Sequence, residues 1–183
     1  MTSFERPPVE REELVAALDV VTLVEVDRGE LAGELRVHGD VRRRLDGADD
    51  QPMELASWVE AVGRLRESPI AHRSAHLARL EGMPLAMRAV AIRSQGRVIA
   101  TGLTIIEGDC AGLFDIITSD EARRQGHARS VISSLLCMAW ELGARHAYLQ
   151  VKEDNVAARR LYAQFGFEER YAYWYRGRPG QQE

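Results

Sequence analysis

The sequence predicts an α/β protein built around one mixed β-sheet, and three observations carry that prediction. Short β-branched and apolar runs recur along the chain, the middle alternates such runs with two-residue turns, and two amphipathic helical patterns separate the last runs. Tight turns predict antiparallel neighbours, whereas strand, helix and strand in succession predict a parallel pair. We therefore expect six or seven strands, largely antiparallel in the first half, with helices on both faces.

The first half of the chain has one strand followed by helical patterns. β-branched residues dominate a short run near the start, and apolar residues at three- and four-residue spacing mark helices farther along. In chain order the expected elements are a strand at 20–26, a weakly helical stretch at 29–44, a turn cluster at 46–50, a helix at 53–67 and a short helix at 72–80. Gly82 and Pro84 end the last of these helices.

The second half begins with three strands that form an antiparallel meander, joined by glycine-containing turns. The expected elements are strands at 87–93, 98–107 and 111–118, a helix at 128–142, a strand at 147–151, a helix capped by Asp154 or Asn155 and ending at Phe165, and a strand at 167–175. Because a helix lies between them, the strands at 111–118 and 147–151 are expected to run parallel or nearly so.

The composition is that of one globular domain, which we place at 14–178 between polar tails at 1–13 and 179–183. The chain has 183 residues, 45% of them hydrophobic, a formal net charge of −4, and two cysteines, Cys110 and Cys137, that form no CxxC pattern. The acidic balance disfavours a nucleic-acid partner, and the lack of a run of about 20 apolar residues disfavours a membrane partner. With no signal-peptide or disulfide pattern, we expect a cytoplasmic protein.

The stretch most informative about function is Arg123-Arg124-Gln125-Gly126-His127-Ala128, between the strand at 111–118 and the next helical pattern. A turn that exposes backbone N–H groups at a helix N-terminus attracts anions, because the helix dipole adds partial positive charge there. A glycine in this turn lets the backbone approach a ligand closely. We therefore predict that a ligand carrying phosphate binds at the turn.

Two motifs in the second half carry a resemblance to a known family. The stretch at 123–128 fits the pattern Q/R-x-x-G-x-G/A, and the stretch at 155–167 reads N-V-A-A-R-R-L-Y-A-Q-F-G-F, which fits N-x-x-A-x-x-L-Y-x-x-x-G-F. Both motifs, in this order and with a strand between them, resemble those of the GNAT superfamily of N-acetyltransferases. The resemblance extends from about Ala86 to Tyr175, and ahead of it only the order of the elements agrees.

The resemblance implies a GNAT-like fold, in which a β-bulge splays the parallel strands apart, and acetyl-CoA as the cofactor. The pyrophosphate would bind the turn at 123–128, and the pantetheine arm would insert beside the strand at 111–118. The cofactor-binding residues implied in this way are Ile116 and Thr118 through their backbones, Arg123, Arg124, Gln125, Gly126, His127, Ala128, Arg129, Asn155 and Ala158. Among them, arginine side chains would add charge-assisted contacts, and the asparagine would contact the pantetheine arm.

The resemblance also places a tyrosine, matched by Tyr162, near the sulfur of the cofactor. Because tyrosine has a pKa of about 10 and a thiol one of about 8.5, Tyr162 can protonate the leaving thiolate, with a hydrogen bond alone as the alternative. The glutamate base of some relatives is replaced here by Gly112. We therefore predict Asp115 on the same strand as the base, with Glu107 as the alternative.

Together these residues predict an acetyl-CoA-dependent N-acetyltransferase, in which a primary amine attacks the thioester directly within a ternary complex. The acceptor is a small-molecule amine or a protein N-terminus, and the alternative is a regulatory module that binds acyl-CoA with little or no catalysis. His72 and His76 have a metal-like spacing without a third ligand, so we assign them to an exposed or acceptor-side helix face and expect no metal. Only one strand follows the last helix, so a homodimer that covers or completes the sheet is plausible.

Overall fold

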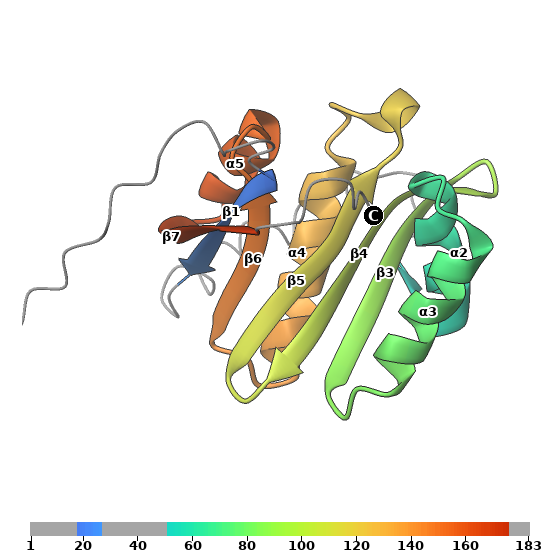
Figure 1. Cartoon of the computed structure of the whole chain (residues 1–183), viewed down its shortest axis with the longest axis horizontal. Coiled ribbons are helices and arrows are strands. Elements are labelled where there is room, and N and C mark those ends of the chain that lie inside the picture. The colour runs from blue at the N-terminus through green and yellow to red at the C-terminus, as the bar shows by residue number, and fades with distance from the viewer. Residues whose placement is uncertain (1–17, 27–50, 176–183) are drawn as a thin grey trace, which may run out of the picture.

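The computed structural model describes residues 18–26 and 51–175, and its centre is a seven-stranded mixed sheet in the order β2-β3-β4-β5-β6-β1-β7 (Figure 1). The strands are β1 Leu18–Val26, β2 Gln51–Pro52, β3 Ala86–Ser94, β4 Arg97–Glu107, β5 Cys110–Thr118, β6 His146–Lys152 and β7 Glu168–Tyr175. The helices are α2 Leu55–Leu65, α3 Ile70–Glu81, the short 3-10 helix η2 Asp120–Ala122, α4 His127–Glu141 and α5 Val156–Ala163. The predicted α/β class is confirmed.

Side-chain caps mark where two of the helices begin. The Glu54 carboxylate accepts hydrogen bonds from the N–H groups of Ala56 and Ser57 and so caps α2. The side chain of Asn155 caps α5 by accepting a hydrogen bond from the N–H of Ala158 at 3.2 Å. Of the two capping residues that the sequence allowed for α5, the asparagine is therefore the one used.

Helices cover both faces of the sheet, as predicted. Neighbouring residues of a strand point to opposite faces, and in β4 Ile105 packs in one hydrophobic cluster while Ile106 packs in the other. The cluster of Ile105 contains Trp58 of α2 and Leu80 of α3, whereas the cluster of Ile106 contains the buried side of α4 and Tyr162 of α5. Thus α2 and α3 form one outer layer, and α4 and α5 form the other (Figure 1).

The strands β5 and β6 run parallel, as predicted, but they pair only along the first part of β5. The pairing begins with Cys110 opposite His146 and ends with Leu113 opposite Leu149. From there to the end of β5 the two strands diverge (Figure 1). No strand of the described residues pairs with the backbone groups on this side of β5, so in the described part of the chain they are available to a ligand.

β5 also has a bulge against β4, close to the point where it leaves β6. Leu103 faces Phe114 whereas Thr101 faces Ile117, so β5 has one residue more than β4 in this interval. Asp115 lies in the bulge with a φ of 50°, in the left-handed region that residues other than glycine seldom adopt. The bulge therefore determines the direction of this carboxylate.

The first strand of the chain lies between its last two strands. β1 pairs antiparallel with β6 on one side and with β7 on the other. All seven described strands therefore come from one copy of the chain. The two-residue strand β2, paired with β3, is the one described strand that the sequence did not predict, because Gln51-Pro52 carries no alternating pattern.

Several sequence expectations fall outside the described residues. They are the tails at 1–13 and 179–183, the weakly helical stretch at 29–44 and the turn at 46–50. The extent of the domain, 14–178, likewise stays a prediction. Among the helices between residues 51 and 175, none is long and apolar enough to cross a bilayer.

Trp58 anchors α2 to the sheet, and we predict its contribution to stability. Its side chain is fully buried, and its indole N–H has no hydrogen-bond partner among the described residues. Trp58→Ala is expected to lower the free energy of unfolding by about 3–5 kcal/mol, as truncation of a buried aromatic residue usually does. Trp58→Phe removes no hydrogen bond and should cost much less. Urea denaturation measures both changes, and equal losses would contradict the prediction.

Candidate active site

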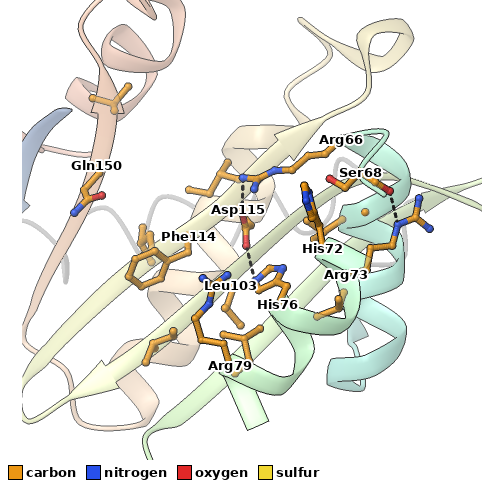
Figure 2. A pocket seen from close by; sticks show the side chains of 18 of the residues that line it. Arg66, Ser68, His72, Arg73, His76, Arg79, Leu103, Phe114, Asp115 and Gln150 are labelled. Carbon is orange, nitrogen blue, oxygen red and sulfur yellow. Dashed lines mark hydrogen bonds and ion pairs between the residues drawn. The ribbon is translucent and has the colours of Figure 1, made fainter. Parts of the chain in front are cut away.

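A cavity of about 710 Å³ opens between the α2–α3 layer and the splayed edge of the sheet. Side chains of α2 and α3 form one wall, β4 and β5 form the floor, and β6 with α5 forms the far wall. Figure 2 shows Arg66, His76 and Asp115 pointing toward one another in this cavity. Asn155 and Tyr162 line the same cavity, so the residues of the second motif and the bulge of β5 face one space.

The carboxylate of Asp115 is the centre of the polar contacts in the cavity. Its Oδ1 lies 2.5 Å from Nη2 of Arg66, and its Oδ2 lies 3.5 Å from Nε2 of His76 (Figure 2). Only 11% of the Asp115 side chain is exposed, so its charge needs these partners. Thr101 supports the bulge by donating its hydroxyl hydrogen to the Asp115 carbonyl at 3.2 Å.

His76 lies beside this carboxylate and yet is neutral at neutral pH. Burial is the main cause of a lowered pKa for His76; the charge of Asp115 raises this pKa in part, and the charges of Arg79 and Arg66 lower it again. The ring of Trp58 packs edge-on against the imidazole, with 6.0 Å between the ring centroids. The neutral imidazole therefore has a lone pair that can accept a proton in this cavity.

Tyr162 is the second buried titratable group in the cavity. Burial raises the pKa of Tyr162 to about 12, so the phenol keeps its proton over the physiological range. Its ring packs edge-on against Phe167, with 6.0 Å between the ring centroids. No described residue forms a hydrogen bond with its hydroxyl group, which leaves that group free to donate to a ligand.

The turn predicted to bind an anion leads directly into α4. Gly126 is the N-cap residue with a φ of 87°, and no side chain caps the helix. In the described part of the chain, no group accepts a hydrogen bond from the first-turn N–H groups of His127, Ala128 and Arg129. These donors and the helix dipole together suit a pyrophosphate group.

Two arginine side chains of this turn already contact the protein. Arg123 forms an ion pair with Asp120 at 2.6 Å, and Arg129 lies over the ring of Phe165, 5.2 Å from its centroid. Arg124, with a φ of 60°, has no ion pair with a described residue. The backbone N–H groups of the turn are thus more available to an anion than the side chains of Arg123 and Arg129, which already have partners in the protein.

The other predicted residues of the turn and of β5 occupy different environments. Gln125 donates its side-chain hydrogen to the Glu121 carbonyl at 3.0 Å, and Nδ1 of His127 is buried without a partner among the described residues. Ile116 lines the cavity, and Thr118 ends β5; both lie on the part of β5 that has no partner in β6. Their backbones are thus where a pantetheine arm would pair.

The second motif places two of its three predicted residues in the cavity. Asn155 uses Oδ1 to cap α5, and its side-chain N–H groups have no described partner, so they remain able to donate to a ligand. Tyr162 lines the same cavity two turns later. Ala158 packs against the hydrophobic core instead.

Gly112, where the resemblance places a glutamate in some relatives, is closely surrounded by the ends of two aromatic side chains. A Cβ added there would lie 2.5 Å from Cε2 of Phe114 and 2.8 Å from the hydroxyl oxygen of Tyr148, both closer than real contacts. Glu107, the alternative base, is exposed at the end of β4 and does not line the cavity. Asp115 is therefore the predicted carboxylate that reaches the cavity.

Sequence reasoning missed the basic partners of that carboxylate. Arg66 directly follows α2 and belongs to no motif, so no pattern singled it out. His72, His76 and Arg79 recur at spacings of four and three, which places them on one face of α3 and was a readable signal. Between residues 51 and 175, no group of three or more metal-ligating side chains could hold a metal ion.

The fold of this chain is that of solved N-acetyltransferases. The chain belongs to the acetyltransferase (GNAT) family, whose sequence profile matches residues 54–167, more than half of the chain.

Relatives with curated descriptions are also N-acetyltransferases. The ribosomal protein bS18-alanine N-acetyltransferase of Escherichia coli strain K12 is 31% identical over 78 residues, which cover 43% of this chain and 53% of that protein. The uncharacterized N-acetyltransferase YobR of Bacillus subtilis strain 168 is 29% identical over 121 residues, which cover 65% of this chain and 48% of that protein. The chain thus spans about half the length of the curated relatives it matches.

Solved structures show the same fold at low sequence identity. A GCN5-related N-acetyltransferase from Kribbella flavida superposes with a TM-score of 0.62 and 22% identity, over 91% of this chain and 60% of that one. AAC(6')-Iy, an aminoglycoside N-acetyltransferase in complex with a bisubstrate analogue of CoA, superposes with a TM-score of 0.59 and 18% identity, over 72% of this chain and 98% of that one.

The charges around His76 predict how its pKa responds to substitution. Asp115→Asn should lower the pKa further because the carboxylate raises it, whereas Arg79→Gln should raise the pKa because the guanidinium lowers it. An NMR titration of the imidazole protons measures both shifts, with His146 at the start of β6 as an internal reference. If neither substitution changes the pKa of His76, the charges of Asp115 and Arg79 do not act on the imidazole as predicted.

Proposed function

We propose that the protein is an N-acetyltransferase that moves an acetyl group from acetyl-CoA to a primary amine by direct attack in a ternary complex. One observation carries the proposal: a single cavity is lined by Ile116 on the open part of β5, by Tyr162, and by the pair of Asp115 and His76. Donor-side and acceptor-side groups therefore face the same space, as direct transfer requires. The N-acetyltransferase relatives and the GNAT family membership support this activity.

The donor side of the site consists mainly of backbone groups. When bound, acetyl-CoA supplies an acetyl group activated as a thioester. The first-turn N–H groups of α4, beginning after Gly126, would hold its pyrophosphate. The unpaired backbone at Ile116 and Thr118 and the side-chain N–H groups of Asn155 would orient its pantetheine arm. A free N–H of this part of β5 would polarise the carbonyl that the amine attacks.

The acceptor side of the site removes the proton from the amine. His76 is neutral at pH 7 and can take this proton, because burial and two arginines lower its pKa. Asp115 stabilises the imidazolium that results, in the way that a carboxylate supports a catalytic histidine. Since the Asp115 charge is already paired with Arg66, we assign proton transfer to the Asp115–His76 pair rather than to the carboxylate alone.

Tyr162 would act on the leaving sulfur. Because burial raises the pKa of Tyr162 to about 12, complete proton transfer to a thiolate, with a pKa of about 8.5, costs about 5 kcal/mol. Donation of a hydrogen bond as charge develops on the sulfur avoids that cost. The role of general acid that the sequence suggested is therefore proposed in this weaker form, as a hydrogen-bond donor that stabilises the thiolate.

A second function, an acyl-CoA-binding module without catalysis, is favoured by Gly112, which provides no carboxylate at the position where some relatives carry a glutamate base. Release of thiol from acetyl-CoA in the presence of a panel of primary amines separates the two functions. Release that requires an amine supports the transferase. Tight CoA binding without release for any amine, including a peptide N-terminus, supports the module.

Tyr162→Phe tests the role of the hydroxyl within the same assay. The variant should lower kcat by about tenfold to a hundredfold, the usual loss of a hydrogen bond to a charged group. Its stability and its affinity for CoA should change little, because no described residue forms a hydrogen bond with the hydroxyl. Near-normal turnover with a good acceptor would show that Tyr162 serves packing alone.

Gly126→Val tests the pyrophosphate site, and Gly96→Val is its matched control. Both glycines have a positive φ, 87° and 76°, and an added Cβ meets nothing within 4 Å at either position. Both variants should therefore lose a similar stability of about 1–2 kcal/mol from backbone strain. Only Gly126→Val should weaken CoA binding, by about tenfold in isothermal calorimetry. Equal CoA affinity of the two variants would place the pyrophosphate elsewhere.

The homodimer also remains a proposal. The sheet needs no strand from a partner, since β1 lies beside β7, but the outer edge of β7 pairs with no described strand. Light scattering coupled to size exclusion measures the mass in solution, and a clean monomer at high concentration would exclude the dimer.

A further inference from the structure

The lining of the cavity is basic, in contrast to the acidic chain as a whole. The chain has a formal net charge of −4. The described lining nevertheless contains four cationic side chains, Arg66, Arg73, Arg79 and Lys152, and one acidic side chain, Asp115. A cleft lined by one sign of charge concentrates ligands of the opposite sign.

Two of these arginines are already paired with other groups of the protein. Arg66 binds Asp115 at 2.5 Å. Arg73 binds Glu60 at 3.1 Å and donates from Nε to the Ser68 carbonyl at 2.9 Å, and so connects α2 to α3. Their charges are largely compensated, so neither is the first candidate for a ligand contact.

Arg79 is different, because no described residue forms an ion pair or hydrogen bond with its guanidinium group. It lies on the cavity face of α3 with His72 and His76, and its side chain extends toward Phe114 and His76 (Figure 2). It is close enough to His76 to influence that imidazole electrostatically. An exposed guanidinium at a cavity wall is a fork-shaped donor suited to carboxylate or phosphate.

The phosphates of the donor do not explain this arginine. The uncapped N-terminus of α4 follows the C-terminal end of β5, at the top of Figure 1, whereas the C-terminal end of α3 lies toward the bottom of that view, and Arg79 belongs to the last turn of α3. The two cationic regions thus lie at opposite ends of the site. A ligand that reaches Arg79 approaches from the acceptor side.

We propose that the acceptor is an amine that also carries an anionic group, a carboxylate or a phosphate, and that Arg79 binds this group while the amine lies at His76 and Asp115. The inference rests on the proposed function, since it names the acceptor class of that site. It disfavours polycationic acceptors, because Arg79, whose guanidinium pairs with no described residue, repels them.

Matched pairs of small amines test the inference by binding, independently of turnover. The probes are phenylalanine against phenylalaninamide, O-phosphoethanolamine against ethanolamine, and spermidine as a polycation. Each is titrated calorimetrically into the full chain saturated with CoA. At least one anionic probe should bind about tenfold or more tightly than its neutral partner, as a charge-assisted hydrogen bond provides. The preferred pair distinguishes carboxylate from phosphate.

Two variants assign the preference to one side chain. Arg79→Gln should reduce the ratio of affinities within the preferred pair to near one. Arg64→Gln, which removes an exposed arginine of α2 that does not line the cavity, should leave the ratio unchanged. Wild-type ratios near or below one in both pairs, tighter binding of spermidine than of both anionic probes, or a ratio unaffected by Arg79→Gln would overturn the inference.

Thiol release from acetyl-CoA with the same probes separates this inference from the proposed function. Release that favours the anionic probe, with the preference lost in Arg79→Gln, supports both. Binding through Arg79 without release of thiol for any amine supports the anion site and argues against the transferase function. Release with neutral amines and no preference for an anionic probe supports the transferase and overturns the anion site.

Discussion

The early end of pairing between β5 and β6 is the constraint on which the rest of the site depends. Past Leu113 and Leu149, the two strands stop sharing hydrogen bonds, and their facing backbone groups need another partner. The bulge against β4 occurs in the same part of β5, and the uncapped N-terminus of α4 follows a few residues later. One short segment thus opens an edge for a ligand on one side and turns Asp115 toward α2 and α3 on the other.

Tyr162 and His76 are both neutral in the cavity, and burial, which disfavours the charged form, is the main cause in each case. Burial alone raises the pKa of Tyr162, whereas burial and two arginines outweigh Asp115 and lower the pKa of His76. Pairs of titratable groups whose pKa values are moved apart are typical of sites that accept a proton at one place and donate hydrogen at another. Because the pKa values of His76 and Tyr162 are moved apart, the imidazole is without its proton and the phenol keeps its proton over the same range of pH.

Local signals in the sequence predicted most of the described fold, while the donor-side residues that they also suggest stay a prediction. Turn glycines, β-branched runs and the cap at Asn155 act over a few residues, so their effect is visible in the sequence. The partners of Asp115 were not predictable in this way. Arg66 and His76 meet the carboxylate only because two helices pack over a bulge, and neither bulge direction nor helix packing is encoded in a short pattern. A short pattern does not reveal the position of β1 in the sheet either, because its neighbours β6 and β7 come from the far part of the sequence.

That position has a consequence for how the chain folds. Val21 pairs with Lys152 and with Tyr173, so the last part of the sheet forms only when the two ends of the chain meet. Such pairings raise the contact order, and the entropy of closing a long loop must be overcome before the contacts form. During synthesis, β6 and β7 emerge long after β1, and until β6 is made β1 has no neighbour in the sheet. The meander of β3, β4 and β5 pairs locally, so it can form first and offer β6 and then β1 an edge to join.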